Sequence, residues 1–357
     1  MDKIKYIFTL GTLFLAATPA IAADIKVYGR AHISLDVIDD GKDYQELGLS
    51  SNASRLGFKA EKTFDELTAF AQIETEINFA QGEGSVWAGR DTFVGVKGDW
   101  GQVKAGRFDS PFKSARSPVN IFGDMVGDLR NVTRSGNLRF DERNPNTIEY
   151  KTPTMNGFTV ATAVSLHEGA SAGTTSTTVD SNGQVISKKG DRQRNQAYDI
   201  AVSYKQGPID FAAAYETYQD DANRGGRDAF RIAGAYKVLP DLNLGAFYQL
   251  SQHDDELKNP DVNIYGVTAD YKIAAKTYVR GQYFIRDVDT SDSNSDLIAL
   301  GLEHRLDSTL RVYGHLATVL NDKKANRTPW EQARTNNLTG TLGEDALALS
   351  VGMRYDF

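Results

Sequence analysis

The histidines are the residues of this sequence best suited to acid–base chemistry, because an imidazole changes its charge near neutral pH. They are scattered over the whole chain, at His32, His167, His253, His304 and His315. None stands in a recognisable motif with a nucleophile and an orienting carboxylate, as hydrolytic catalysis requires. We therefore expect no catalytic residue and no enzymatic activity, and an enzyme is kept as an alternative.

One acidic segment, Asp287–Asp296, offers the oxygen ligands that Ca²⁺ prefers. It lacks the central glycine and the terminal glutamate of an EF-hand loop, so a solvated acidic loop is the better interpretation. The chain has 0 cysteines, so disulfides cannot hold it together. The sequence predicts no metal site and no cofactor.

Arginines occupy the polar faces of segments in which polar and apolar residues alternate. Each of the following lies opposite an apolar row: Arg30, Arg55, Arg139 and Arg143. At Arg90 the assignment is less clear, because neighbouring charges break the alternation. Arginines held at one height in water, offset by facing carboxylates, create a transverse field that orients and sorts polar solutes.

The alternation itself defines the elements that carry these arginines. In Ala346–Phe357 every second residue is large and apolar, which predicts a strand with one apolar face and one polar face. The same pattern occupies residues 24–37 and recurs in segments of about ten residues, the span of a tilted membrane strand. Lipid outside a closed barrel and water inside it would satisfy both faces.

The connections between these segments alternate in length. Tight turns are predicted at 65–66, 97–101, 152–157, 205–208, 239–241, 273–276 and 305–308. Long polar stretches are predicted at 39–51, 109–135, 168–195, 219–228, 252–261, 287–295 and 321–345. This asymmetry is typical of outer-membrane barrels, and the segments amount to about sixteen strands, enough for an aqueous lumen.

Aromatic residues stand near the predicted strand ends: Tyr28, Phe58, Phe70, Phe93, Tyr150, Phe158, Tyr198, Tyr215, Tyr236, Tyr271, Tyr355 and Phe357. Two girdles at the headgroup boundaries would explain them. Ordinary strand propensity is the alternative. We expect girdles, because many of these residues lie beside turns.

The first 22 residues predict a secretory signal peptide. Lys3 and Lys5 precede an apolar run, and Ala20–Ala22 forms a small-x-small cleavage site. The run is too short for a spanning helix. Removal leaves residues 23–357 as one barrel domain with 38 basic and 46 acidic residues, a net charge of −8 that disfavours nucleic-acid binding.

Several stretches resemble the general diffusion porins of Gram-negative bacteria. They are Tyr28–Arg30, Ser54–Lys59, Arg90 with Val94–Gly101, Gly106–Phe108 with Ser110–Pro111, Arg143–Pro153, and the terminal Tyr355 and Phe357. Each motif is weak, but their order and spacing over the mature chain are specific.

The resemblance implies an all-β fold, a sixteen-stranded antiparallel transmembrane barrel in the cell outer membrane, usually trimeric. It implies a third loop, about 109–135, that folds into the lumen and narrows a channel for passive diffusion. It also implies a basic ladder on the wall (Arg30, Arg55, Arg90, Arg139 and Arg143) facing loop acids (Asp109, Asp124 and Asp128). The expected partners are two further copies of the chain, lipid, lipopolysaccharide, ions and small hydrophilic solutes.

The loop departs from the enteric pattern, because Ser110–Lys113 replaces its Pro-Glu-Phe-Gly-Gly stretch and Arg116 and Arg130 add cations. These cations favour anions at the constriction, whereas the net charge of the chain disfavours them at the outer vestibule. A substrate-specific channel is the main alternative function, and a barrel adhesin is a further one. The sequence names no natural solute.

Overall fold

The computed structural model describes residues 24–357 apart from 85–86, 135, 167–174, 180–184, 190–195, 222–223, 257 and 333–337. The predicted signal peptide therefore lies outside the described residues. Within the described part of the chain, no helix has the length and apolar character that crossing a membrane demands.

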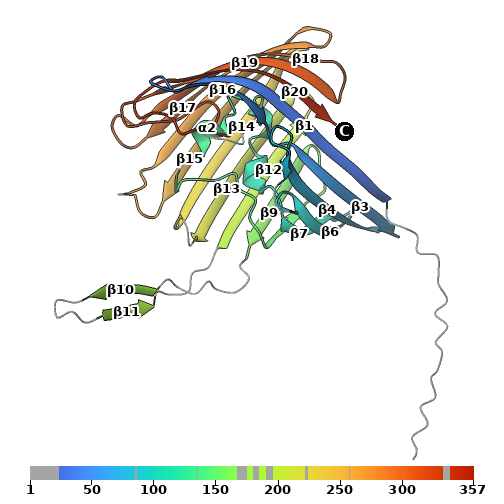
Figure 1. Ribbon diagram of the computed structural model, residues 1–357. Helices are drawn as coiled ribbons and strands as arrows, with labels where there is room; N and C mark the ends of the chain where they lie inside the picture. Colours follow the sequence, from blue (N-terminus) through green and yellow to red (C-terminus); the bar gives the residue numbers. More distant parts are fainter. Residues whose placement is uncertain are drawn as a thin grey trace, which may run out of the picture.

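All but two of the described strands form one large antiparallel sheet that closes on itself (Figure 1). The first half contains β1 (Asp24–Asp39), β2 (Gln45–Ser51), β3 (Arg55–Phe64), β4 (Leu67–Asn78), β5 (Glu83–Gly84), β6 (Thr92–Gly98), β7 (Gly101–Arg107), β8 (Thr147–Lys151) and β9 (Phe158–Ser165). The second half contains β12 (Gln196–Gln206), β13 (Ile209–Asp220), β14 (Arg227–Leu239), β15 (Leu242–His253), β16 (Val262–Ala274), β17 (Thr277–Val288), β18 (Ser295–Arg305), β19 (Leu310–Asn321) and β20 (Ala346–Asp356). The barrel closes where β1 pairs with β20.

The fold prediction of sixteen antiparallel strands is confirmed for the described chain. The count follows when β2 and β3 are taken as two halves of one strand and the two-residue β5 is set aside. Both β2 and β3 pair with β1, one after the other, across a break at residues 52–54. The predicted stretch 39–51 was therefore too long, because its second half is β2.

The apolar and polar faces of the strands have the predicted orientation, with the apolar face outward. In β20, the side chains of Leu347, Leu349 and Val351 are exposed on the outer face, whereas Ala346 and Ala348 are buried. Exposed aliphatic residues recur in this way along the other strands. The barrel therefore presents an apolar band outward and a polar wall inward.

The girdle prediction requires side chains on the outer face of the barrel, and only part of its residues meet this condition. Nine of the aromatic side chains are exposed on the outer face: Phe58, Tyr150, Phe158, Tyr198, Tyr215, Tyr236, Tyr271, Tyr355 and Phe357. The prediction is wrong for Tyr28, Phe70 and Phe93, which share the inward parity of Arg30, Gln72 and Glu74 in the paired strands. Strand parity, which places these three on the wet face, overrides their nearness to turns.

The segment between β7 and β8 lies against the inner face of the barrel wall. It contains α1 (Pro111–Ser114), a 3-10 turn η1 (Ser117–Val119) and α2 (Arg130–Thr133). Its apolar side chains pack on small, aliphatic and aromatic inward residues of strands β12 to β20. Gly127, with φ +88°, approaches that wall so closely that an added Cβ would lie 2.7 Å from the Cβ of Ala299. This segment is called the inner loop below.

Strand β8 begins only at Thr147. The prediction that Arg139 and Arg143 lie on a strand after the loop is therefore wrong, and their parity carries no information. The chain from Leu138 to Asn146 is irregular and includes two residues with positive φ, Asp141 and Asn146.

The last long connection, from β19 to β20, braces the inner loop. Trp330 is fully buried with Phe122 and Val126. The amide of Gly127 donates to the carbonyl of Pro329 at 2.7 Å, and the amide of Gln332 donates to Asn131 Oδ1 at 2.8 Å. Within the stretch expected as a long outer loop, β10 (Thr175–Val179) and β11 (Val185–Lys189) form a separate hairpin.

Candidate functional site

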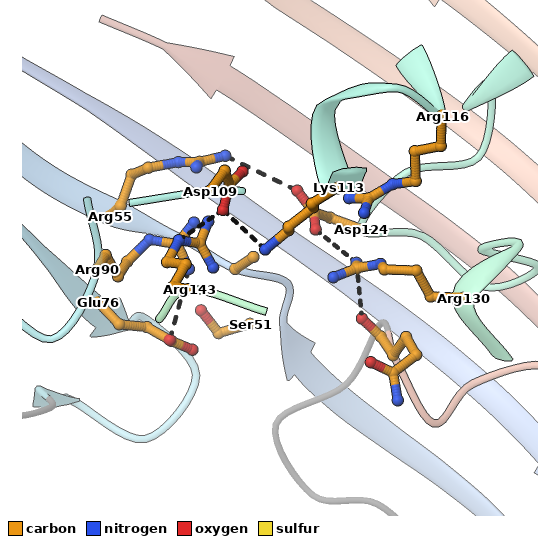
Figure 2. Close-up of a pocket in the computed structure, with 12 residues that line it drawn as sticks. Ser51, Arg55, Glu76, Arg90, Asp109, Lys113, Arg116, Asp124, Arg130 and Arg143 are labelled. Carbon is orange, nitrogen blue, oxygen red and sulfur yellow. Dashed lines mark hydrogen bonds and ion pairs between the residues drawn. The ribbon is translucent and has the colours of Figure 1, made fainter. Parts of the chain in front are cut away.

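A hollow of about 310 Å³ lies between the inner loop and the wall formed by β3, β4 and the chain after β5. Figure 2 shows Arg55 and Arg90 on the wall side, with Lys113, Arg116 and Arg130 on the loop side and Asp124 between them. We call this space the charged hollow. Among the described residues that line it are six cationic and three acidic side chains.

The wall side of the charged hollow is built by cross-strand pairing. Arg30 of β1 lies directly opposite Arg55 of β3. Like charges in such a pair repel and destabilise the sheet, so the arrangement needs compensation. Asp124 of the inner loop supplies it, at 3.3 Å from Arg30 and 3.7 Å from Arg55. The loop is thereby tied electrostatically to the first strands of the barrel.

Arg90 is held by a carboxylate of the neighbouring strand. Its Nε lies 2.6 Å from Glu74 Oε1, and a second nitrogen lies 3.6 Å from Glu76. Glu74 also contacts Arg55 and accepts a hydrogen bond from the Tyr28 hydroxyl at 2.9 Å. The guanidinium groups are thus fixed in direction by acids of the wall as well as by the loop.

Asp124 occupies a strained position at the tip of the inner loop. Its φ is +61°, a conformation that Asp tolerates better than most residues. Its amide donates to Asp128 Oδ2 at 2.7 Å, and Arg130 binds both acids. Burial opposes ionisation, but the guanidinium groups of Arg130, Arg55 and Arg30 outweigh it and hold the pKa of Asp124 well below its usual range. Asp124 therefore stays charged.

A second charge cluster stands where the inner loop begins. Asp109 contacts Lys113 Nζ and Arg143 Nε, both at 2.8 Å. Burial lowers the pKa of Lys113 to about 8, and Asp109 only partly restores it. Burial raises the pKa of Asp109, but Lys113 and Arg143 overcome this effect and bring it to about 2.

The structure brings most of the predicted residues to this place. Arg55, Arg90, Arg143, Asp109 and Asp124 line the charged hollow, and Arg30 contacts Asp124 beside it. Besides Arg30, two further predicted residues are not among the lining. Asp128 is fully buried within the inner loop, where it binds Arg130. Arg139 is paired with Glu142. It belongs to the irregular chain before β8, so it is not part of the strand wall.

Sequence reasoning missed the wall acids and the contribution of the last long connection. Glu74 and Glu76 share the polar face of β4, so their parity could have identified them. Gln332 lines the charged hollow although it lies 202 residues after Arg130 of the inner loop, and no local signal predicts that contact.

A buried network anchors both ends of the inner loop to the wall. Arg231 of β14 donates to the carbonyl of Phe112 at 2.9 Å and to both oxygens of Asp141, at 2.6 and 3.0 Å. Arg116 binds the same carboxylate at 3.0 Å. Asp199 of β12 accepts the amide of Phe112. These contacts fix the position of the loop charges.

The arrangement can act on solutes through its electric field. Within the described part of the chain, no group of acidic or histidine side chains has the geometry of a metal site. Fixed guanidinium, ammonium and carboxylate groups face one another across a wet space, which orients dipoles and discriminates between ions of opposite sign.

Comparison with known proteins gives one family. The sequence model of the family described as Gram-negative porin matches residues 10–324. The major outer membrane protein P.IA of Neisseria meningitidis is 25% identical over 83% of this chain and 89% of its own length. The chitoporin of Vibrio furnissii is 29% identical over 48% of this chain and 51% of its own. The family description and the name of the chitoporin both denote porins.

Solved structures share the fold. The anion-selective porin from Comamonas acidovorans superposes with a TM-score of 0.76 at 22% identity, covering 94% of this chain and 100% of its own. The trimer form of OmpT from Vibrio cholerae superposes with a TM-score of 0.65 at 19% identity, covering 94% of this chain and 100% of that one.

Proposed function

The chain belongs to the family of Gram-negative porins, and from this premise we propose that the charged hollow is the selective constriction of its channel. As a porin of the outer membrane, it forms a water-filled channel through which small hydrophilic solutes diffuse. The observation that carries the proposal is the opposition of Arg30, Arg55 and Arg90 on the wall to Asp124 on the inner loop.

The inner loop, about residues 109–135, sets the width of the passage. Its anchoring by Arg231 and Asp141 supports this role, because a size limit needs a loop that stays in place. The ladder consists of Arg30, Arg55, Arg90 and Arg143, and the opposing acids are Asp109 and Asp124. Arg139 and Asp128 act indirectly, through Glu142 and Arg130.

The constriction prefers anions. Cations outnumber acids six to three among the described residues that line the charged hollow, and the low-dielectric walls focus the resulting field. A structure of similar fold bears the name of an anion-selective porin, which supports the same sign. Solutes are sorted by charge and size, with no cofactor.

The working form is a homotrimer. One structural neighbour is described as a trimer form. We expect the folded protein to migrate as a trimer on a gel when it is not heated and as a monomer after boiling. A monomer under both conditions, from protein that conducts ions, would contradict this assembly.

Single-channel currents in a planar bilayer under a KCl gradient test the function. We expect current steps grouped in threes. We also expect the reversal potential to have the sign of an anion-selective channel. Absence of conductance from folded, heat-modifiable protein would refute the diffusion channel.

The double variant Arg55→Glu, Arg90→Glu tests the constriction. We expect its reversal potential to shift toward cation preference, because four units of charge change inside the charged hollow. The matched control is Lys42→Glu, Lys258→Glu, which changes the net charge equally at exposed positions in outer connections. An unchanged reversal potential in the first variant would remove these arginines from the constriction.

A further inference from the structure

Four aromatic rings lie in a row at the inner wall on the short-turn side of the charged hollow, and one of them, Phe108, is buried. Tyr28, Phe70 and Phe93 belong to β1, β4 and β6, and Phe108 follows β7. Phe70 meets Phe93 edge to face at 6.1 Å between ring centroids, and Phe93 meets Phe108 in the same way at 5.9 Å.

Lysines lie over these rings. Lys59 Nζ is 4.5 Å from the centroid of Tyr28, and Lys97 is 5.7 Å from that of Phe70. Lys104 is 5.2 Å from Phe93 and 3.9 Å from Phe108. We call these three lysines and four rings the lysine–aromatic wall.

The rings hold the ammonium groups without neutralising them. A cation–π contact is electrostatic, but the ring carries no net charge, so the field of the lysine persists in the pore. Two of the lysines also have acid partners, Lys97 with Glu61 at 3.0 Å and Lys104 with Glu149 at 3.1 Å. The charge balance still favours cations at this surface.

A hollow of about 190 Å³ opens on this wall. Phe70 and Phe93 line it together with Lys59, Lys97 and Lys104, and Glu61 is the acid among its described lining residues. Its size suits one small ring, since an engineered apolar cavity of about 150 Å³ accepts benzene. This hollow therefore combines aromatic surface with an excess of positive charge, and it is large enough for a small ligand.

The lysine–aromatic wall continues the arginine ladder along the same pair of strands. Arg30 lies opposite Arg55, Tyr28 lies opposite Gly57, and Lys26 lies opposite Lys59. Steps of two residues advance about 7 Å along a strand. Two successive pairs of like charges destabilise the sheet. Their presence is explained if the charges attract a solute that passes through the pore.

We propose that the lysine–aromatic wall is a second binding subsite of the pore, for small carboxylates that carry a flat apolar ring. The carboxylate binds Lys59 and Lys97, and the ring lies against Phe70 and Phe93. An anion that leaves the charged hollow on the short-turn side meets this subsite next. This proposal depends on the proposed channel function in one respect only: the ligand must reach the subsite through the pore. Binding itself requires no ion flow.

Calorimetric titration of the detergent-solubilised full-length protein with sodium benzoate and with sodium acetate tests the subsite. We expect benzoate to bind about tenfold more tightly than acetate, because ring contacts with two phenylalanines add to an equal charge interaction. Equal weak binding of both anions would overturn the proposal and leave only nonspecific attraction by lysines.

Variants locate the binding on this wall. Lys59→Gln, Lys97→Gln should weaken benzoate binding about tenfold or more. Phe70→Leu should reduce the preference for benzoate over acetate and leave acetate binding unchanged. The matched control is Lys62→Gln: Lys62 lies over the Phe64 ring at 5.1 Å and belongs to β3, but its parity is outward. If Lys62→Gln weakens binding as much as the double variant, the subsite is wrong.

The failure of this proposal is distinguishable from failure of the constriction. Arg55→Glu, Arg90→Glu should change the reversal potential and retain the benzoate-to-acetate affinity ratio. Loss of that ratio in the arginine variant would assign benzoate binding to the charged hollow and overturn the second subsite. Conversely, a shifted reversal potential with no benzoate binding would leave the constriction proposal intact.

Discussion

Lys113 is the side chain through which pH should act on the charged hollow. It lies in α1, is almost completely buried, and contacts Asp109. Burial lowers its pKa to about 8, with Arg143 and Arg116 opposing its charge further and Asp109 favouring it. The arginines around it keep their charge throughout this range.

The predicted consequence is a selectivity that declines in mild alkali. Lys113 should be about nine-tenths charged at pH 7 and about one-tenth charged at pH 9, given its lowered pKa. Because the folded pKa lies below that of free lysine, the positive charge is present below about pH 8 and lost above it. Anion preference, measured as the reversal potential in a KCl gradient, should therefore decrease between these two values.

The variant Lys113→Met removes the titrating group and should show no such change. Its reversal potential at pH 7 should approach that of the wild type at pH 9. A wild-type potential that stays constant from pH 7 to pH 9 would mean that Lys113 does not titrate in this range.

At the scale of elements, Asp141 decides whether the inner loop stays anchored. Its carboxylate is fully buried between Arg231 and Arg116. Burial disfavours the charge, but the two guanidinium groups more than compensate and hold the pKa of Asp141 far below its usual range. Its stabilising contribution is thus complete above the unfolded pKa of about 4 and is lost only as pH falls through the much lower folded pKa.

We expect Asp141→Asn to destabilise the protein by about 3 kcal/mol or more, because it leaves Arg231 buried without a counter-charge. Thermal unfolding in detergent, followed by circular dichroism, measures the loss, and the released loop should make single-channel currents noisier. The matched control is Lys205→Met, which removes a pair with a 2.6 Å contact that lies in solvent and should cost at most about 1 kcal/mol. Equal losses in the two variants would show that burial does not distinguish these pairs.

The strands could be predicted from the sequence because a single pattern, the alternation of apolar and polar residues, determines them. Alternation identified the strands and placed Arg30 and Arg55 on the inward face, because a period of two leaves no other choice. It failed for Arg143, which reaches the charged hollow from irregular chain. Nearness to turns misplaced Phe70 and Phe93, although their parity was available. The contact of Gln332 with Arg130 depends on tertiary packing of distant connections, which no periodicity encodes.

For the whole molecule, the first and last strands are the elements that close the barrel. β20 forms ten residue pairs with β1 and ten with β19. The backbone of Phe357 also exchanges hydrogen bonds with Gly29, at 2.8 and 3.0 Å. An open sheet edge in lipid leaves amide and carbonyl groups without partners, at several kcal/mol each. Closure is therefore a condition for the membrane-inserted fold rather than a small increment of stability.

A chain that ends at Asp345 should consequently not fold into membranes. It lacks β20, so β1 and β19 each keep an unpaired edge, and we expect neither a heat-modifiable band on a gel nor conductance in a bilayer. The matched control deletes residues 175–189, the β10–β11 hairpin, which pairs with no other strand among the described residues. That deletion removes more residues than the truncation, yet it should retain folding and conductance, because it opens no edge. Conductance from the truncated chain would refute the requirement for closure by β20.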